Sequence, residues 1–158
     1  MDDTSRLFAS LTALGFNPKM ESFSERKRVQ KMVYLLDKTV EMNFNFPYNW
    51  YLHGPYSPQV TKIIYNVVEG HQKVASDQAI LSANDYNKIN RLKCFLGKDI
   101  DSIDELELLV SVHYLLNCSG YSGPNKKGIV EFMREKKPYF TESQVCNAID
   151  RLHPLIKQ

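Results

Sequence analysis

Residues 50–58 of the chain read Trp50-Tyr51-Leu52-His53-Gly54-Pro55-Tyr56-Ser57-Pro58. Gly54-Pro55 is a dipeptide typical of turns. Ser57-Pro58 is a helix-start signal, because the hydroxyl can accept a hydrogen bond from a free amide and proline needs no N–H in the first helical turn. These residues therefore predict a rigid corner that leads into a helix.

The stretch before this corner alternates between apolar and other residues. Every second position is apolar, which is the period of one strand face: Phe44, Phe46, Tyr48, Trp50 and Leu52. Such a face either packs on the core or stacks on single-stranded bases. The alternation favours the core-facing strand, with Asn43, Asn45 and Asn49 in solvent. Pro47 predicts that the strand lies at an edge or is broken there.

Helical periodicity covers most of the remaining chain. A stripe over about residues 24–42 follows a capping box of Ser22 and Glu25, and another runs from Pro58 to Glu69. Further helices are expected over about 4–14, 83–96, 102–116, 126–137 and 141–156, and a short hairpin over 73–81. Residues 102–116 are apolar nearly all round, so they should form the central helix. The predicted fold is mainly α (α+β), with about six helices, a small β component and a winged-helix-like corner.

Length and composition are those of one globular domain that spans residues 1–158. Hydrophobic residues make up 43%, charged residues 24%, and the net charge is +2. No apolar run is long enough to span a membrane, and the first residues lack the features of a secretory signal. The three cysteines are odd in number and widely spaced, which argues against a disulfide framework. We therefore expect a cytoplasmic protein without a membrane partner.

Motifs for catalysis, nucleotide binding or metal binding are not evident in the sequence. The loop Gly120–Gly123 lacks the Gly-Lys-Ser/Thr ending of a phosphate loop, and the four histidines are far apart. The acidic stretch Asp99–Glu107 lacks the spacing of a calcium loop and suits a helix N-terminus. We expect no catalytic residue, metal or cofactor, and a hydrolase without a recognisable motif is the weakest hypothesis.

Two histidines have specific expectations. His113 falls on the most apolar helix, where a hydrogen-bonded core histidine is the simplest interpretation. His53 sits in the Gly-Pro corner, where it either bonds free backbone groups or has a ligand-binding or catalytic role.

Two motifs resemble the Panacea domain family and the related YwgA-like proteins. Val29-Gln30-Lys31-Met32-Val33-Tyr34-Leu35-Leu36 is similar to a "lys-leu-val-tyr-leu" helix, and residues 50–58 are similar to a "tyr-gly-pro-tyr-ser-pro" corner. The resemblance is best over 25–97, whereas 98–158 matches only in helical character. It implies a mainly helical domain whose corner supports a helix, as in winged-helix proteins. It also implies an antitoxin that neutralises a toxin by direct contact, with relatives among phage-defence or mobile-element genes.

The function expected from this resemblance is a non-enzymatic protein-binding module whose partner is a cognate toxin or effector protein. Aromatic and arginine anchors dominate protein interfaces. The candidate contacts are therefore Tyr51, His53, Tyr56, Arg26 and Arg28. Tyr56 could instead brace the corner. The alternative is a winged-helix-like regulator that binds nucleic acid through Lys27, Lys31, Lys126, Lys127 and Arg134, although such basic groups are also typical of a solvated helix face.

Overall fold

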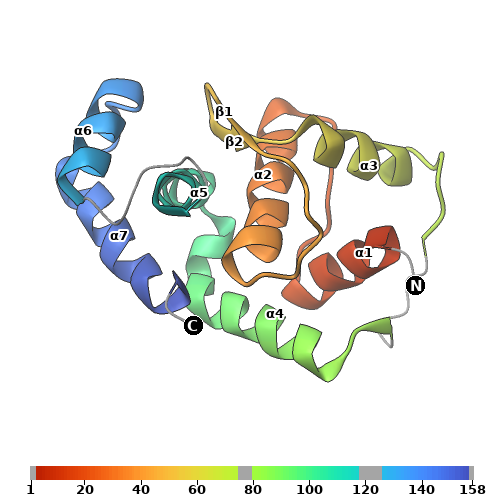
Figure 1. Ribbon diagram of the computed structural model, residues 1–158. Helices are drawn as coiled ribbons and strands as arrows, with labels where there is room; N and C mark the ends of the chain where they lie inside the picture. The colour runs from red at the N-terminus through yellow and green to blue at the C-terminus, as the bar shows by residue number, and fades with distance from the viewer. Residues whose placement is uncertain (1–2, 75–79, 118–125, 157–158) are drawn as a thin grey trace.

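The computed structural model describes residues 3–74, 80–117 and 126–156 (Figure 1). Its α-helices are α1 (Asp3–Leu14), α2 (Phe23–Tyr34), α3 (Pro58–Val68), α4 (Ala83–Leu96), α5 (Ile103–Asn117), α6 (Lys126–Lys136) and α7 (Glu142–Ile156). A π-helical turn, Leu35–Thr39, extends α2, and a 3₁₀ turn, Gly97–Asp101, joins α4 to α5. Strands β1 (Asn49–Tyr51) and β2 (Gly54–Tyr56) pair antiparallel. The predicted mainly α (α+β) fold is confirmed.

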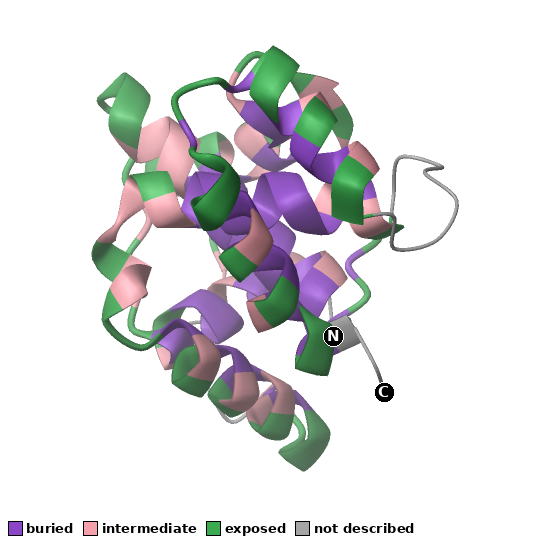
Figure 2. Ribbon diagram, turned by 90° about the vertical axis from the view of Figure 1, so that its left-hand side faces the viewer, coloured by how far each residue is buried: buried purple, intermediate pink, exposed green. Residues whose placement is uncertain are grey.

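Helix α5 is the central element of the fold. It packs against α2 on one side and against α6 and α7 on the other (Figure 1), and it also contacts β2. The buried residues gather toward the middle of the molecule, while the outer helices alternate between buried and exposed positions (Figure 2). Every residue from Leu106 to His113 is buried. The prediction that this is the most buried helix is therefore confirmed.

His113 is a hydrogen-bonded core histidine, as predicted. Its Nδ1 lies 2.8 Å from the hydroxyl oxygen of Tyr34 on α2, and only 4% of the residue is exposed. Burial lowers the pKa of His113 to about 4, because a charged ring would lose its hydration there. The ring is therefore neutral at pH 7 and joins α5 to α2.

The helix N-termini follow the predicted caps in part. Ser22 and Glu25 form the expected reciprocal capping box at the start of α2. Ser102 and Glu105 have the same spacing at the start of α5, but only one of the two bonds of a capping box forms there: the amide of Glu105 donates to Ser102 Oγ at 3.2 Å. The Glu105 carboxylate instead accepts from Arg151 of α7 at 3.2 Å. A long-range ion pair has replaced the local bond.

The predicted strand before the corner is much shorter than expected. Burial alternates from Asn43 to Phe46 as predicted, but strand pairing begins only at Asn49, after Pro47. The backbone amides of Phe44, Asn45 and Phe46 donate to the buried carboxylate of Asp37 at 2.8–3.0 Å. These amides are therefore not available to a partner strand. Positive φ angles interrupt the extended backbone at Glu41, Asn43 and Asn45.

The corner contains a strand of its own, which the sequence did not predict. Tyr51 pairs with Gly54, and Asn49 with Tyr56, so the chain reverses at Leu52 and His53. Leu52 was expected on the core-facing side, but it lies in the turn and is 81% exposed. The hairpin predicted over 73–81 lies largely outside the described residues. Among the described residues, no helix has both the length and the apolar character needed to cross a membrane.

Candidate protein-binding site at the hairpin

Two buried lysines hold the hairpin turn onto the helices. Lys31 of α2 is 2% exposed, and its Nζ donates to the carbonyl of His53 at 2.6 Å and to that of Pro55 at 3.3 Å. Lys137, directly after α6, donates from Nζ to the carbonyl of Leu52 at 3.0 Å. The prediction of Lys31 as a phosphate contact is therefore wrong, because its ammonium group is used inside the fold.

Glu107 of α5 is the anion of this cluster. Its carboxylate lies 2.9 Å from Lys137 Nζ and 3.0 Å from Lys27 Nζ, and it accepts a hydrogen bond from the hydroxyl of Tyr139. Burial by itself would raise the pKa of Glu107. The hydrogen bonds from Tyr139, Lys137 and Lys27 outweigh burial and lower this pKa to about 2. Glu107 is therefore ionised at neutral pH.

The cluster carries more positive than negative charge. Lys27 and Lys137 share the Glu107 carboxylate. The charges of all three groups affect the pKa of Lys31. Burial, together with the nearby charges of Lys137 and Lys27, lowers the pKa of Lys31 to about 7, although the charge of Glu107 opposes this shift. The hairpin therefore packs on a cluster of three lysines, Lys27, Lys31 and Lys137, that shares one carboxylate, Glu107.

The hairpin backbone fits closely against α5. Gly54 has φ +95°, a conformation that favours glycine, and a Cβ built on it would meet Ser111 Oγ at 2.9 Å and Lys31 Nζ at 3.2 Å. The Ser111 hydroxyl is buried and makes no hydrogen bond with the described residues. A glycine at position 54 therefore allows both the turn and its close contact with Ser111 and Lys31.

Gln30 of α2 fixes the exit from the hairpin into α3. Its side-chain amide donates to the carbonyl of Ser57 at 2.8 Å, and its Oε1 accepts from the amide of Ser57 at 2.9 Å. Ser57 was expected to cap α3 with its hydroxyl, but it makes no side-chain cap and its Oγ is buried without a partner among the described residues. The helix begins at Pro58 as predicted.

A groove of about 420 Å³ runs beside the hairpin. Apolar rings form its walls: Phe23 lies edge-on to His53 with ring centres 4.9 Å apart, and Tyr51 lies edge-on to Tyr56 at 5.2 Å. The groove is lined by Phe23, Arg26, Lys27, Gln30, Lys31, Tyr51, Leu52, His53, Gly54, Tyr56 and Thr61. Its lining combines exposed apolar and aromatic side chains with the basic side chains of Arg26 and Lys27.

Most of the predicted partner contacts meet in this groove. Tyr51, His53, Tyr56 and Arg26 all line it, and Thr61 donates to the Tyr56 hydroxyl at 3.1 Å. Within the described part of the chain, the His53 ring makes no hydrogen bond to the corner backbone, whereas the His53 carbonyl accepts from Lys31 Nζ. Tyr56 is half-buried, so it both braces the hairpin and faces the groove.

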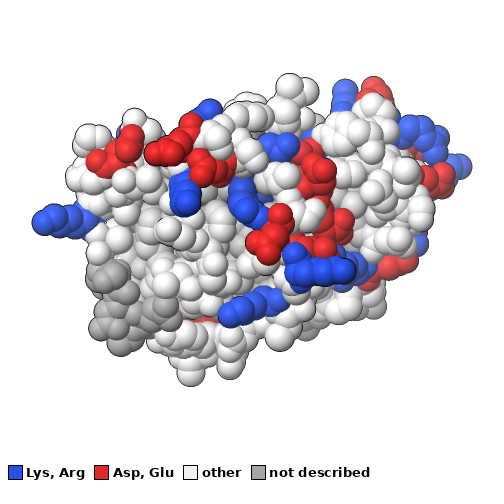
Figure 3. Space-filling model, turned by 180° about the vertical axis from the view of Figure 1, so that it is seen from behind, with Lys and Arg blue, Asp and Glu red and all other residues white. Residues whose placement is uncertain are grey.

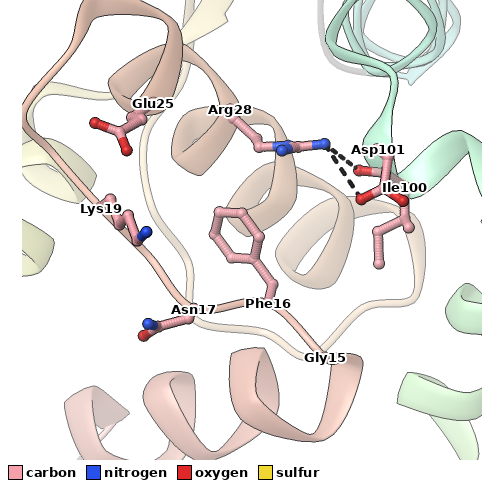
Figure 4. Close-up of a pocket in the computed structure, with 8 residues that line it drawn as sticks. All are labelled: Gly15, Phe16, Asn17, Lys19, Glu25, Arg28, Ile100 and Asp101. Atoms are coloured by element: carbon pink, nitrogen blue, oxygen red, sulfur yellow. Dashed lines mark hydrogen bonds and ion pairs between the residues drawn. The ribbon is translucent and has the colours of Figure 1, made fainter.

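Arg28 does not belong to the groove. It lines a separate hollow of about 390 Å³, where Phe16 points toward the middle (Figure 4). Arg28 Nη2 donates to the carbonyl of Ile100 at 2.9 Å and lies 3.6 Å from Asp101 Oδ1. Helix positions two apart point in nearly opposite directions, which separates Arg28 from Arg26.

The residues predicted for nucleic-acid binding are divided between two regions. Lys27 and Lys31 belong to the hairpin cluster on α2, whereas Lys126, Lys127 and Arg134 lie exposed on α6, with α5 between the two helices (Figure 1). Lys126 pairs with Asp150 at 3.0 Å and Arg134 with Glu142 at 3.3 Å. On the face seen from behind, basic and acidic side chains are intermingled (Figure 3).

Several residues of the site escaped the sequence analysis. Glu107 was included in the acidic stretch that suits a helix N-terminus, and Lys137 was not among the candidate residues. The sequence signal that could have indicated the buried cluster was Glu107 itself, an acid among the apolar residues of α5. In the part of the chain that the structure describes, no group of His, Cys, Asp and Glu side chains could hold a metal ion.

Comparison of the chain with protein-family models, with curated proteins and with solved structures gives no match. The family resemblance of residues 25–97 therefore remains a prediction from two motifs.

Proposed function

We propose that the chain is a non-enzymatic protein-binding module of the antitoxin-like type, which acts in the cytoplasm by direct contact with a toxin or effector protein. The contact surface is the hairpin tip together with its groove. The observation that carries the proposal is the exposure of large apolar side chains around one anchored turn: Leu52 is 81% exposed, Tyr139 60% and Phe23 55%. Clustered exposed apolar groups with a polar rim are typical of protein interfaces.

The anchoring of the hairpin supports the same proposal. Lys31 and Lys137 hold three carbonyls of the turn, and Trp50 packs against Tyr114 of α5 and Phe132 of α6. A surface that is fixed before binding loses little conformational entropy when a partner arrives. The fold therefore presents Leu52 on a rigid base instead of on a free loop.

The test is co-purification of the tagged protein after co-expression with its genomic neighbours, read by mass spectrometry. We expect one stoichiometric protein partner with the wild type, and at least a tenfold loss of it, roughly the effect of one interface anchor, with Leu52→Ser or Phe23→Ser. Val68→Ser is the matched control, because Val68 is an apolar residue, 39% exposed, that does not line the groove.

Equal recovery of the partner with Leu52→Ser and with Val68→Ser would show that the hairpin is not the interface. Recovery of nucleic acid without a protein partner would favour the regulator that binds nucleic acid. A partner that is toxic when expressed alone would favour the antitoxin within the broader class of binding modules.

A further inference from the structure

The groove beside the hairpin has an unbalanced charge. Three basic side chains line it, Arg26, Lys27 and Lys31, and none of the described lining residues is a carboxylate. The buried Lys31 Nζ already donates to the carbonyls of His53 and Pro55, so Arg26 and Lys27 carry the positive charge that an incoming group can meet. The carboxylate of Glu107, which pairs with Lys27, is already shared with Lys137. An incoming anion would therefore meet positive potential without a competing carboxylate on the walls.

Arg26 is placed to meet such an anion at the edge of the groove. Its Nη1 donates to the carbonyls of Met20 at 3.1 Å and Glu21 at 3.2 Å, which fixes the side chain. The guanidinium carries further N–H donors on Nη2 and Nε, in the planar arrangement that suits a carboxylate. Burial, followed by the charge of Lys27, lowers the pKa of His53, which agrees with a positive surrounding.

The walls of the groove restrict what can carry the anion. Lys27 lines the groove together with the rings of Phe23, His53 and Tyr51, and its side chain is only 18% exposed. A carboxylate on a side chain can enter such a space while apolar neighbours cover the rings. A phosphate of a nucleic-acid backbone is flanked by more phosphates and sugars, which the apolar walls would leave without partners.

We infer that this groove binds an acidic side chain of the partner protein, an Asp or Glu with apolar residues beside it in the partner's chain. The inference rests on the proposed function and specifies the chemistry of the partner at that surface. The acid approaches Arg26 and Lys27, and the apolar neighbours cover Phe23, Tyr51 and Leu52. A charged contact of this kind sets specificity as well as affinity.

The experiment is selection of a randomised peptide display library on the immobilised wild-type protein, followed by synthesis of the most enriched peptide. We expect enriched sequences with Asp or Glu beside apolar residues. The synthetic peptide should bind about tenfold more tightly than its version with the corresponding amide, the effect of one charged hydrogen-bonded contact. Its affinity should fall similarly in Arg26→Gln and stay unchanged in Arg28→Gln, which removes the same charge from the other side of α2.

Other outcomes would overturn the inference. These are enrichment of apolar peptides without acids, enrichment of basic peptides, no enrichment, or an equal loss of affinity in Arg26→Gln and Arg28→Gln. A single-stranded oligonucleotide that loses affinity in Arg26→Gln would assign the groove to nucleic acid instead. If co-purification depends on Leu52 but no acidic peptide is selected, the inference fails and the proposed function stands. If co-purification is independent of Leu52 and Phe23, the proposed function itself fails at this surface.

Discussion

Gly54 and Ser111 lie so close together that a Cβ on the glycine would sit 2.9 Å from the serine Oγ. The two residues are far apart in sequence, one in the hairpin turn and the other in the middle of α5. Where they meet, the backbone of the hairpin also lies against Lys31. This closeness leads to a prediction that separates packing from backbone strain.

Gly54→Ala should destabilise the fold by about 1–3 kcal/mol more than Gly70→Ala, measured by urea unfolding. Both glycines have positive φ, so both variants introduce backbone strain, but nothing lies within 4 Å of a Cβ at Gly70. The double variant Gly54→Ala with Ser111→Ala should cost less than the sum of the single variants. Strict additivity would mean that the contact has no energetic weight.

Glu107→Gln should lower the free energy of unfolding by about 3–5 kcal/mol, because Lys27 and Lys137 would lose the carboxylate that compensates their charge. Asp104→Asn is the control, since Asp104 is an exposed acid on the same helix. It should change stability by less than about 0.5 kcal/mol. Similar losses in the two variants would argue that the buried network is not special.

His113 should make stability depend on pH between about 6.5 and 4. Its folded pKa is about 4, below the ordinary value of 6.5, so the unfolded chain binds the proton more readily in this window. The stability contributed by the neutral ring is complete above pH 6.5 and is lost as the pH falls toward 4. We expect the stability difference between wild type and His113→Gln to shrink by about 2–3 kcal/mol from pH 7 to pH 4. A constant difference in urea unfolding would contradict this assignment.

Asp37→Asn should loosen the segment before the hairpin. The carboxylate accepts three backbone amides at 2.8–3.0 Å, and an asparagine would place an NH₂ group against at least one of them. We expect a loss of about 2–3 kcal/mol and faster hydrogen exchange at the amides of Phe44 and Phe46. Asp101→Asn, at a side chain that is 89% exposed, is the control and should leave exchange at these amides unchanged.

The parts of the fold that depend on local pattern could be predicted from the sequence. Apolar spacing indicated the helices, the Ser22 and Glu25 spacing indicated a cap, and the apolar surroundings of His113 indicated a core position. The corner at Gly54-Pro55 was also predicted to lead into a helix, and α3 begins at Pro58. Each of these signals lies within a few residues of the feature it predicts.

The parts that depend on distant partners could not be predicted. A charged residue in a helical pattern is assigned to solvent, and only the fold brings Lys31 to the carbonyl of His53 or Lys137 to Glu107. The exposure of Leu52 was missed for a different reason. A period of two residues describes a strand face but does not show where the chain reverses.

The alternating backbone around Asn43 and Asn45 has a consequence for how substitutions are tolerated. Both side chains are exposed, so a scan of surface positions would class them as free to vary. Both backbones have φ +62°, however, where β-branched residues are strongly disfavoured and asparagine or glycine is accepted. A saturation library should therefore find these solvent-facing positions as intolerant of Val or Ile as many interior positions, with Gly as the accepted replacement.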